Sequence, residues 1–187
     1  MKNISVLLFL LITLALNAQN NKTSGLNARQ FHKYWKVESE SPDYKVTFLG
    51  DTVEILSPKG LTLWRKEKMS GKVTIEYDAC VVVEVEGDRL SDLNCFWMAS
   101  DPQYPDNIWK REKWRSGIFL NCYSLQLYYM GYGGNHNSTT RFRRYDGNEA
   151  AITNAKARPA ILKEYTDADH LLEANKWYHI KITNENN

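Results

Sequence analysis

Arginine and tyrosine side chains are concentrated in residues 125–146, which read LQLYYMGYGGNHNSTTRFRRYD. Successive side chains of a β-strand point to opposite faces, so Arg141, Arg143 and Tyr145 would share one face of an extended chain. Guanidinium groups bind carboxylate and sulfate oxygens in a fork geometry, and aromatic rings can stack on sugar rings. This pattern favours an acidic sugar as the ligand. The alternative is an ordinary strand face exposed to solvent.

The same stretch holds residue types that β-elimination from a uronate requires. That reaction needs a group that neutralises the carboxylate, a base near the α-carbon and a proton donor for the leaving oxygen. Arginines and Asn135 could neutralise, His136 could be the base, and Tyr129 or Tyr145 could be base or acid. A histidine in a Gly-Asn loop is alternatively a simple turn residue. The predicted catalytic residues are His136, Tyr129, Arg141 and Tyr145.

Further aromatic and polar side chains would contact the ligand without taking part in chemistry. Tyrosine and tryptophan rings could stack on sugars, whereas asparagine in this loop is alternatively explained by its tolerance of left-handed backbone. The predicted substrate-binding residues are Arg143, Asn135, Asn137, Tyr128, Tyr132, Arg115, Trp109 and Trp114. A non-catalytic carbohydrate-binding module could instead use five aromatic rings as stacking platforms: Tyr128, Tyr129, Tyr132, Trp109 and Trp114.

The turn signals around these residues predict the element that positions them. Gly131, Gly133 and Gly134 allow positive φ angles, and Asp146-Gly147 is a strong turn signal. Residues 125–130 and 139–145 should therefore form a β-hairpin. Other extended patterns separated by turn residues predict further strands. These strands are expected at residues 37–40, 44–49, 52–56, 61–64, 73–86, 92–99, 161–165 and 177–182.

Composition and charge exclude several classes of protein. The chain has 187 residues, 43% hydrophobic, which suits one globular domain and not a disordered chain. Its net charge is only +2, although residues 104–145 hold seven Lys or Arg against Asp106 and Glu112, a local charge of +5. No zinc-finger spacing, recognition helix or ribonucleoprotein motif occurs, so nucleic acid is not the expected partner.

The N-terminus predicts export. Lys2 precedes an apolar run at residues 4–16, which is too short to span a bilayer, and Ala18-Gln19 offers a cleavage site. We therefore expect a signal peptide at residues 1–18, a flexible segment at 19–30, one domain at 31–187, and a secreted or periplasmic location without a membrane span. Three cysteines are an odd number without metal-site spacing, and they are expected as buried free thiols, with one disulfide as the alternative: Cys80, Cys95 and Cys122.

Two further stretches carry a resemblance. The alternating run VTIEYDACVVVEV and the closing KWYHIKI resemble the concanavalin A-like lectin and glucanase superfamily. The stretch YYMGYGGNHNSTTRFRRYDG resembles a family of secreted domains of unknown function from polysaccharide-degrading bacteria. The resemblance implies an all-β antiparallel sandwich, a jelly roll, whose concave face binds glycans. Because the last strand is followed by few residues, we also expect the natural domain to continue with further strands.

The resemblance also raises alternatives to a lyase. Retaining glucanases of this superfamily carry acidic residues at alternate positions of one strand. Glu76 and Asp78 match, but Cys80 follows on the same face and Glu84 comes too late. Calcium is common in such sandwiches and needs six or more oxygen ligands. The loops offer only two candidate acids, Asp101 and Asp106, which are too few for such a site. No cofactor or metal is therefore predicted.

Together these patterns predict a secreted jelly-roll domain that binds an acidic, uronate-containing polysaccharide and cleaves it by β-elimination. A non-catalytic carbohydrate-binding module, a glycoside hydrolase of the same fold and a structural or adhesion domain are the alternatives.

Overall fold

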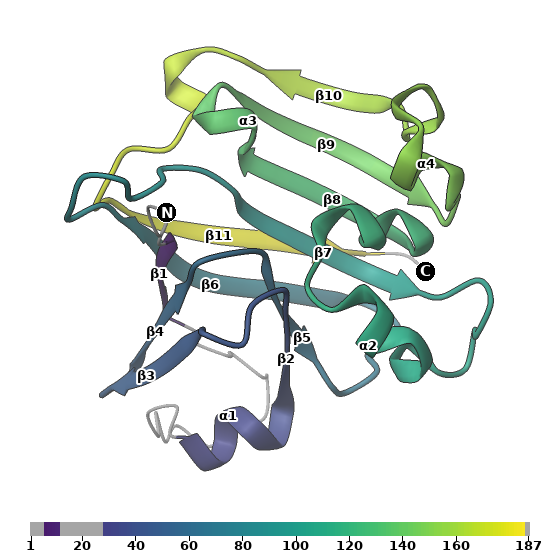
Figure 1. The fold of residues 1–187 in the computed structure, drawn as a ribbon, viewed down its shortest axis with the longest axis horizontal. Coiled ribbons are helices and arrows are strands. Elements are labelled where there is room, and N and C mark those ends of the chain that lie inside the picture. Colours follow the sequence, from purple (N-terminus) through teal and green to yellow (C-terminus); the bar gives the residue numbers. More distant parts are fainter. Residues whose placement is uncertain (1–5, 12–27, 186–187) are drawn as a thin grey trace.

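The computed structural model describes residues 6–11 and 28–185, and in this part the chain is mostly β (Figure 1). The strands are β1 (Val6–Leu11), β2 (Trp35–Ser39), β3 (Lys45–Leu49), β4 (Thr52–Ser57), β5 (Leu61–Arg65), β6 (Val73–Val82), β7 (Leu93–Ser100), β8 (Gln126–Gly133), β9 (Thr139–Asp146), β10 (Ile161–Tyr165) and β11 (Trp177–Asn184). Every stretch that the sequence predicts as extended overlaps one of these strands.

Short helical segments connect the strands. They are α1 (Ala28–Tyr34), η1 (Ile108–Arg111), α2 (Glu112–Arg115), η2 (Phe119–Ser124), α3 (Gly134–Asn137), α4 (Ala150–Thr153), η3 (Ala155–Ala157) and η4 (Ala168–His170), where η marks a 3₁₀ helix. The segment between β7 and β8 is helical at η1, α2 and η2.

The described strands form antiparallel sheets with the orders β11-β6-β1-β4-β3, β10-β9-β8-β7 and β2-β5. Antiparallel β structure is therefore confirmed, whereas a closed sandwich or jelly roll is not shown among the described strands. The larger sheets pack against each other through Ala79 and Val81 of β6, Leu93 of β7 and Leu172. Tyr132 of β8 and Tyr178 of β11 meet edge to face at 5.2 Å between ring centroids.

Strand β6 is shorter than the sequence predicts, and local hydrogen bonds explain why. The backbone N–H groups of Glu84 and Val85 donate to the Asp88 carboxylate at 2.8 and 3.0 Å. The side chain of Asn175 bonds both backbone groups of Val83, at 2.9 and 3.0 Å. These side chains take the place of strand partners, so the ladder ends at Val82 although the hydrophobic alternation continues.

The N-terminal apolar run contributes a strand to the larger sheet. Within residues 4–16, Val6–Leu11 forms β1, which pairs antiparallel with both β4 and β6 (Figure 1). The predicted cleavage site at Ala18-Gln19 lies outside the described residues, and export stays a prediction. In the part of the chain that the structure describes, no helix is long and apolar enough to cross a membrane.

Candidate functional site on the β8–β9 hairpin

Strand register gathers the polar residues of four strands into one row. Asn94 of β7 lies opposite Gly131 of β8, Gly131 opposite Arg141 of β9, and Arg141 opposite Glu164 of β10. The neighbouring row on the same face is Phe96, Tyr129, Arg143 and Ile161. We call this surface the arginine face and define it by Asn94, Phe96, Tyr129, Arg141, Arg143 and Glu164. Its strands lie side by side in Figure 1.

Tyr129 lies along its own strand, with its hydroxyl above Gly131. The hydroxyl donates to Asn94 Oδ1 at 3.2 Å, and a Cβ atom added at Gly131 would lie 2.1 Å from that hydroxyl. Gly131 is therefore required by the position of Tyr129. Tyr129 is 7% exposed, and burial raises its pKa while Arg143 and Arg141 act in the opposite direction. At neutral pH the hydroxyl is a proton donor.

The two arginines of this face have different partners. The Arg141 guanidinium forms an ion pair with Glu164, and the Arg143 guanidinium donates to the carbonyl oxygen of Pro159. Among the described residues, no carboxylate forms an ion pair with Arg143. Arg144 points to the opposite face, where its guanidinium lies 6.0 Å from the Tyr128 ring centroid. The predicted sharing of one face by Arg141 and Arg143 is thus confirmed by the register.

Aromatic rings pack around Tyr129, which lies opposite Arg143. The ring centroid of Phe96 lies 5.4 Å from that of Tyr129, and Phe119 of η2 lies 5.6 Å from Tyr129. Phe119 is 36% exposed, so part of its ring is open to a ligand. The sequence patterns did not predict four residues of this region: Asn94, Phe96, Phe119 and Glu164. The alternation of residues 92–99 was the only available signal, because it puts Asn94 and Phe96 on one face.

The residues at the tip of the hairpin form a left-handed turn. Asn135, His136 and Asn137 have φ angles of 53°, 56° and 57°. The Asn137 amide exchanges two hydrogen bonds of 2.8 Å with the backbone of Leu172, and Asn135 Nδ2 donates to Ser138 Oγ at 3.0 Å. Both asparagines therefore stabilise the turn, as the alternative interpretation predicts. His136 is exposed at the tip, beyond the Gly134–Thr139 bridge.

Two predicted site residues lie inside the protein. Tyr145 is 1% exposed, packs 4.8 Å from the Tyr123 ring centroid, and has a pKa raised by burial. Arg115 is 0% exposed, and its guanidinium forms two hydrogen bonds with the Glu38 carboxylate, at 2.7 and 3.2 Å. The structure thus gives Tyr145 a packing role, and it makes Arg115 the link between α2 and β2 instead of a ligand contact.

The other predicted stacking residues are not on the arginine face. Tyr128 stacks with Trp97 at 5.7 Å on the opposite face of the sheet. Tyr132, whose pKa burial raises to about 12, packs between the sheets. Trp109 and Trp114 belong to η1 and α2, and their rings lie 5.3 Å from Lys36 Nζ and 5.0 Å from the Arg111 guanidinium.

The carboxylates weighed for a hydrolase lie on the larger sheet. His179 Nδ1 is 2.8 Å from Asp78 Oδ1, and His179 Nε2 is 3.1 Å from Glu76 Oε1. Hydrogen bonds with Asp78 and then Glu76 raise the pKa of His179. Lys181 Nζ lies 3.3 Å from Glu76 Oε2. Both carboxylates are therefore engaged by side chains of β11.

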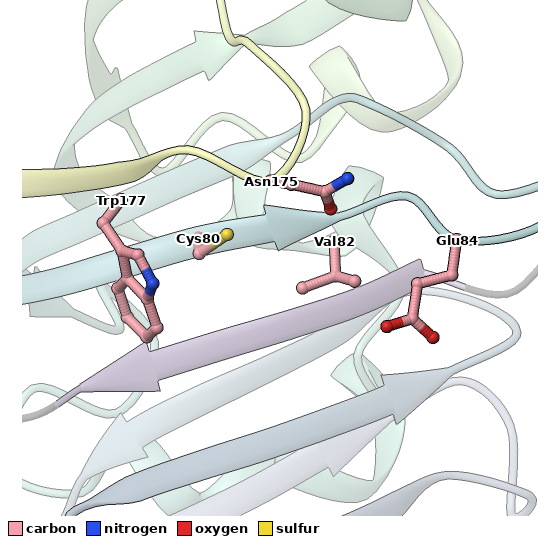
Figure 2. Close-up of a pocket in the computed structure, with 5 residues that line it drawn as sticks. All are labelled: Cys80, Val82, Glu84, Asn175 and Trp177. Atoms are coloured by element: carbon pink, nitrogen blue, oxygen red, sulfur yellow. The ribbon is translucent and has the colours of Figure 1, made fainter.

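A hollow of about 320 Å³ lies on the same face of β6 (Figure 2). Figure 2 shows Trp177 at one end and Glu84 at the other, with Cys80 and Val82 between them and Asn175 above. The hollow has a carboxylate and no cationic side chain in its lining. It is therefore a poorer match for an acidic sugar than the arginine face.

The loop acid Asp101 is occupied by a neighbouring side chain. The Arg111 guanidinium donates to both Asp101 carboxylate oxygens, at 2.8 and 2.9 Å, and Asp101 is buried. Within residues 6–11 and 28–185, no group of three or more His, Cys, Asp or Glu side chains could hold a metal ion.

Comparison with known proteins gives a family. A family described as "Domain of unknown function (DUF6250)" matches residues 55–187, which include every residue of the arginine face. No curated protein and no solved structure matches the chain. Because the match covers more than half of the sequence, the chain belongs to the DUF6250 family.

Proposed function

We propose that the arginine face binds an acidic, uronate-containing polysaccharide. The observation that carries the proposal is Arg143, a guanidinium on an aromatic sheet face whose only hydrogen-bond partner among the described residues is the Pro159 carbonyl. A guanidinium hydrogen-bonded to a neutral acceptor retains its full charge. It can therefore form a charge-assisted hydrogen bond with a ligand carboxylate.

The residues around Tyr129, which lies opposite Arg143, suit the rest of a sugar ring. Phe119 presents a partly exposed ring, and an aromatic face can stack on the apolar face of a sugar. Asn94 and the Tyr129 hydroxyl add donors and acceptors that could bond to ring hydroxyls. A carboxylate at Arg143 would thus place its sugar beside groups that bind the remaining parts of the ring.

Cleavage by β-elimination is a second candidate, and the position of Tyr129 favours it. A hydroxyl beside two arginines could protonate the leaving oxygen while an arginine neutralises the uronate carboxylate. The raised pKa of Tyr129 suits a proton donor better than a base. Since His136 lies at the hairpin tip and Tyr145 is 1% exposed, binding is the function that the geometry supports best, and elimination requires a base besides these residues.

The proposal includes the concanavalin A-like jelly roll and a secreted or periplasmic location. The packing of two antiparallel sheets against each other supports the fold. The apolar run that follows Lys2 supports export, and cleavage at Ala18-Gln19 would then remove β1 from the larger sheet. A polysaccharide outside the cytoplasm would be accessible to such a domain.

Calorimetric titration with a uronate oligosaccharide tests the proposal, with the carboxyl-reduced form of the same oligosaccharide as the neutral control. Arg143→Ala should weaken binding of the acidic form by roughly tenfold or more, because hydrogen bonds to charged groups contribute about 1.5–3 kcal/mol. Arg144→Ala is the matched control, since it removes the same charge from the opposite face. Equal affinities of the two variants would refute the proposed site.

Elimination has its own readout. The wild-type protein should generate ultraviolet absorbance from an unsaturated product, and Tyr129→Phe should abolish that signal while glycan binding persists. Binding without any absorbance change in the wild-type protein would leave a carbohydrate-binding module and exclude the lyase.

A further inference from the structure

Glu164 occupies one of the two guanidinium groups on the arginine face. Its carboxylate forms an ion pair with Arg141, and the two side chains are 35% and 31% exposed. Arg143, one row away, has a neutral carbonyl as its partner. The two guanidinium groups come from positions two residues apart on β9, about 7 Å along the strand. On this face, the charge of Arg141 is therefore balanced by Glu164, whereas the charge of Arg143 is not balanced by a carboxylate among the described residues.

A bulge in β10 puts Glu164 in this position. Ile161 lies opposite Arg143, and in a regular antiparallel ladder the residue opposite Arg141 would then be Lys163. The register shifts between Ile161 and Lys163, so that Lys163 lies opposite Phe142 and Glu164 opposite Arg141. Bulges commonly re-aim a side chain in this way. Here the extra residue replaces a repulsive lysine by an attractive carboxylate.

We propose that Glu164 is an internal counterion that determines how many acidic groups the arginine face accepts, an inference that rests on the proposed function. A ligand carboxylate binds Arg143 directly. To reach Arg141 it must displace Glu164, which is covalently tethered and therefore competes at a high effective concentration. The wild-type face thus selects sugars with one acidic group, and removal of the Glu164 charge opens a second oxyanion position about 7 Å from the first.

The matched pair of variants is Glu164→Gln and Glu173→Gln. Both remove one negative charge and keep the side-chain size, but Glu173 pairs with Lys176, away from this face. The probes are a uronate oligosaccharide, its carboxyl-reduced form, and a uronate disaccharide that also carries a sulfate group. Thermal unfolding of both variants confirms that the fold is retained, and Glu164→Asp, which keeps the charge, should behave like the wild-type protein.

Glu164→Gln should bind the doubly acidic probe about two- to fivefold more tightly than the wild-type protein does, the range expected when a partly exposed ion pair no longer competes. Binding of the neutral probe should not change, and Glu173→Gln should match the wild-type protein throughout. Unchanged or weaker binding of the doubly acidic probe by Glu164→Gln would overturn the inference, and so would an equal gain with the neutral probe. Failure of the wild-type protein to bind any acidic probe would instead overturn the proposed function, and the inference with it.

Discussion

Gly131→Ala tests whether the Tyr129 hydroxyl lies where the arginine face requires it. An alanine Cβ at this position would lie 2.1 Å from the Tyr129 hydroxyl oxygen, 2.5 Å from Cζ and 2.8 Å from Cε1. All three distances are far below van der Waals contact. The φ angle of Gly131 is not among the positive ones, so the added methyl group causes a steric effect without backbone strain.

The expected loss of stability follows from the packing around Tyr129. The ring cannot move freely, because Phe96, Phe119 and Tyr145 surround it at centroid distances of 5.4 to 5.6 Å. Inserting a methyl group into a well-packed site typically costs about 1–3 kcal/mol. For a domain of this size that cost lowers the Tm by about 2–12 °C. The displaced hydroxyl should also leave Asn94, which would weaken glycan binding.

Thermal unfolding followed by circular dichroism measures this cost, and two controls show where it originates. Gly134→Ala is the matched control, because the nearest atom to its added Cβ would be Thr139 O at 3.7 Å, an ordinary contact. Tyr129→Leu lacks the three atoms that clash, so Gly131→Ala should cost much less in that background. An equal loss of stability in both backgrounds would refute the position assigned to Tyr129.

Three further predictions concern the rest of the fold. Arg115→Ala leaves the buried carboxylate of Glu38 without its partner and should destabilise the protein by about 3–5 kcal/mol in denaturant unfolding; a loss below 1 kcal/mol would contradict the burial of this pair. His179 has a raised pKa in the folded state, so its pairing with Asp78 stabilises the protein at pH values below the unfolded pKa and is lost as the pH rises through the folded pKa. The Tm difference between wild type and His179→Gln should therefore shrink from pH 5.5 to pH 8.5, and a constant difference would argue against this pairing. Burial raises the pKa of Cys122 to about 12, so at pH 8 this thiol should react with a thiol reagent only as fast as the protein unfolds, and rapid labelling of the native protein would contradict its burial.

Hydrophobic alternation was sufficient to predict strands β2 to β11 and the faces of the hairpin, but not β1. It places Arg141 and Arg143 together because side-chain direction in a strand depends only on parity along the chain. Parity does not say which strands are neighbours. Asn94 joins the site because β7 pairs with β8, and Glu164 joins it because β10 contains a bulge. Neither feature has a local sequence signal.

Burial of polar residues was the other point that sequence could not supply. Arg115 lies in a basic insertion and is typical of an exposed residue, yet its partner Glu38 is 77 positions away in the chain. Only the tertiary structure brings the two together. Asn137 is a residue whose role the sequence could indicate, because the alternative interpretation, a left-handed turn, depends on local backbone preference. The structure adds its hydrogen bonds to Leu172.

Three arginines within four positions of β9 differ in what they can do, and the difference comes from their partners across the sheet. Arg144 points away from the site, Arg141 is neutralised by Glu164, and Arg143 keeps its charge. The excess of positive charge in the middle of the sequence therefore overstates the charge that a ligand would meet on the arginine face. If the proposed function holds, selectivity for the number of acidic groups depends on the bulge that brings Glu164 opposite Arg141, and not on the number of arginines.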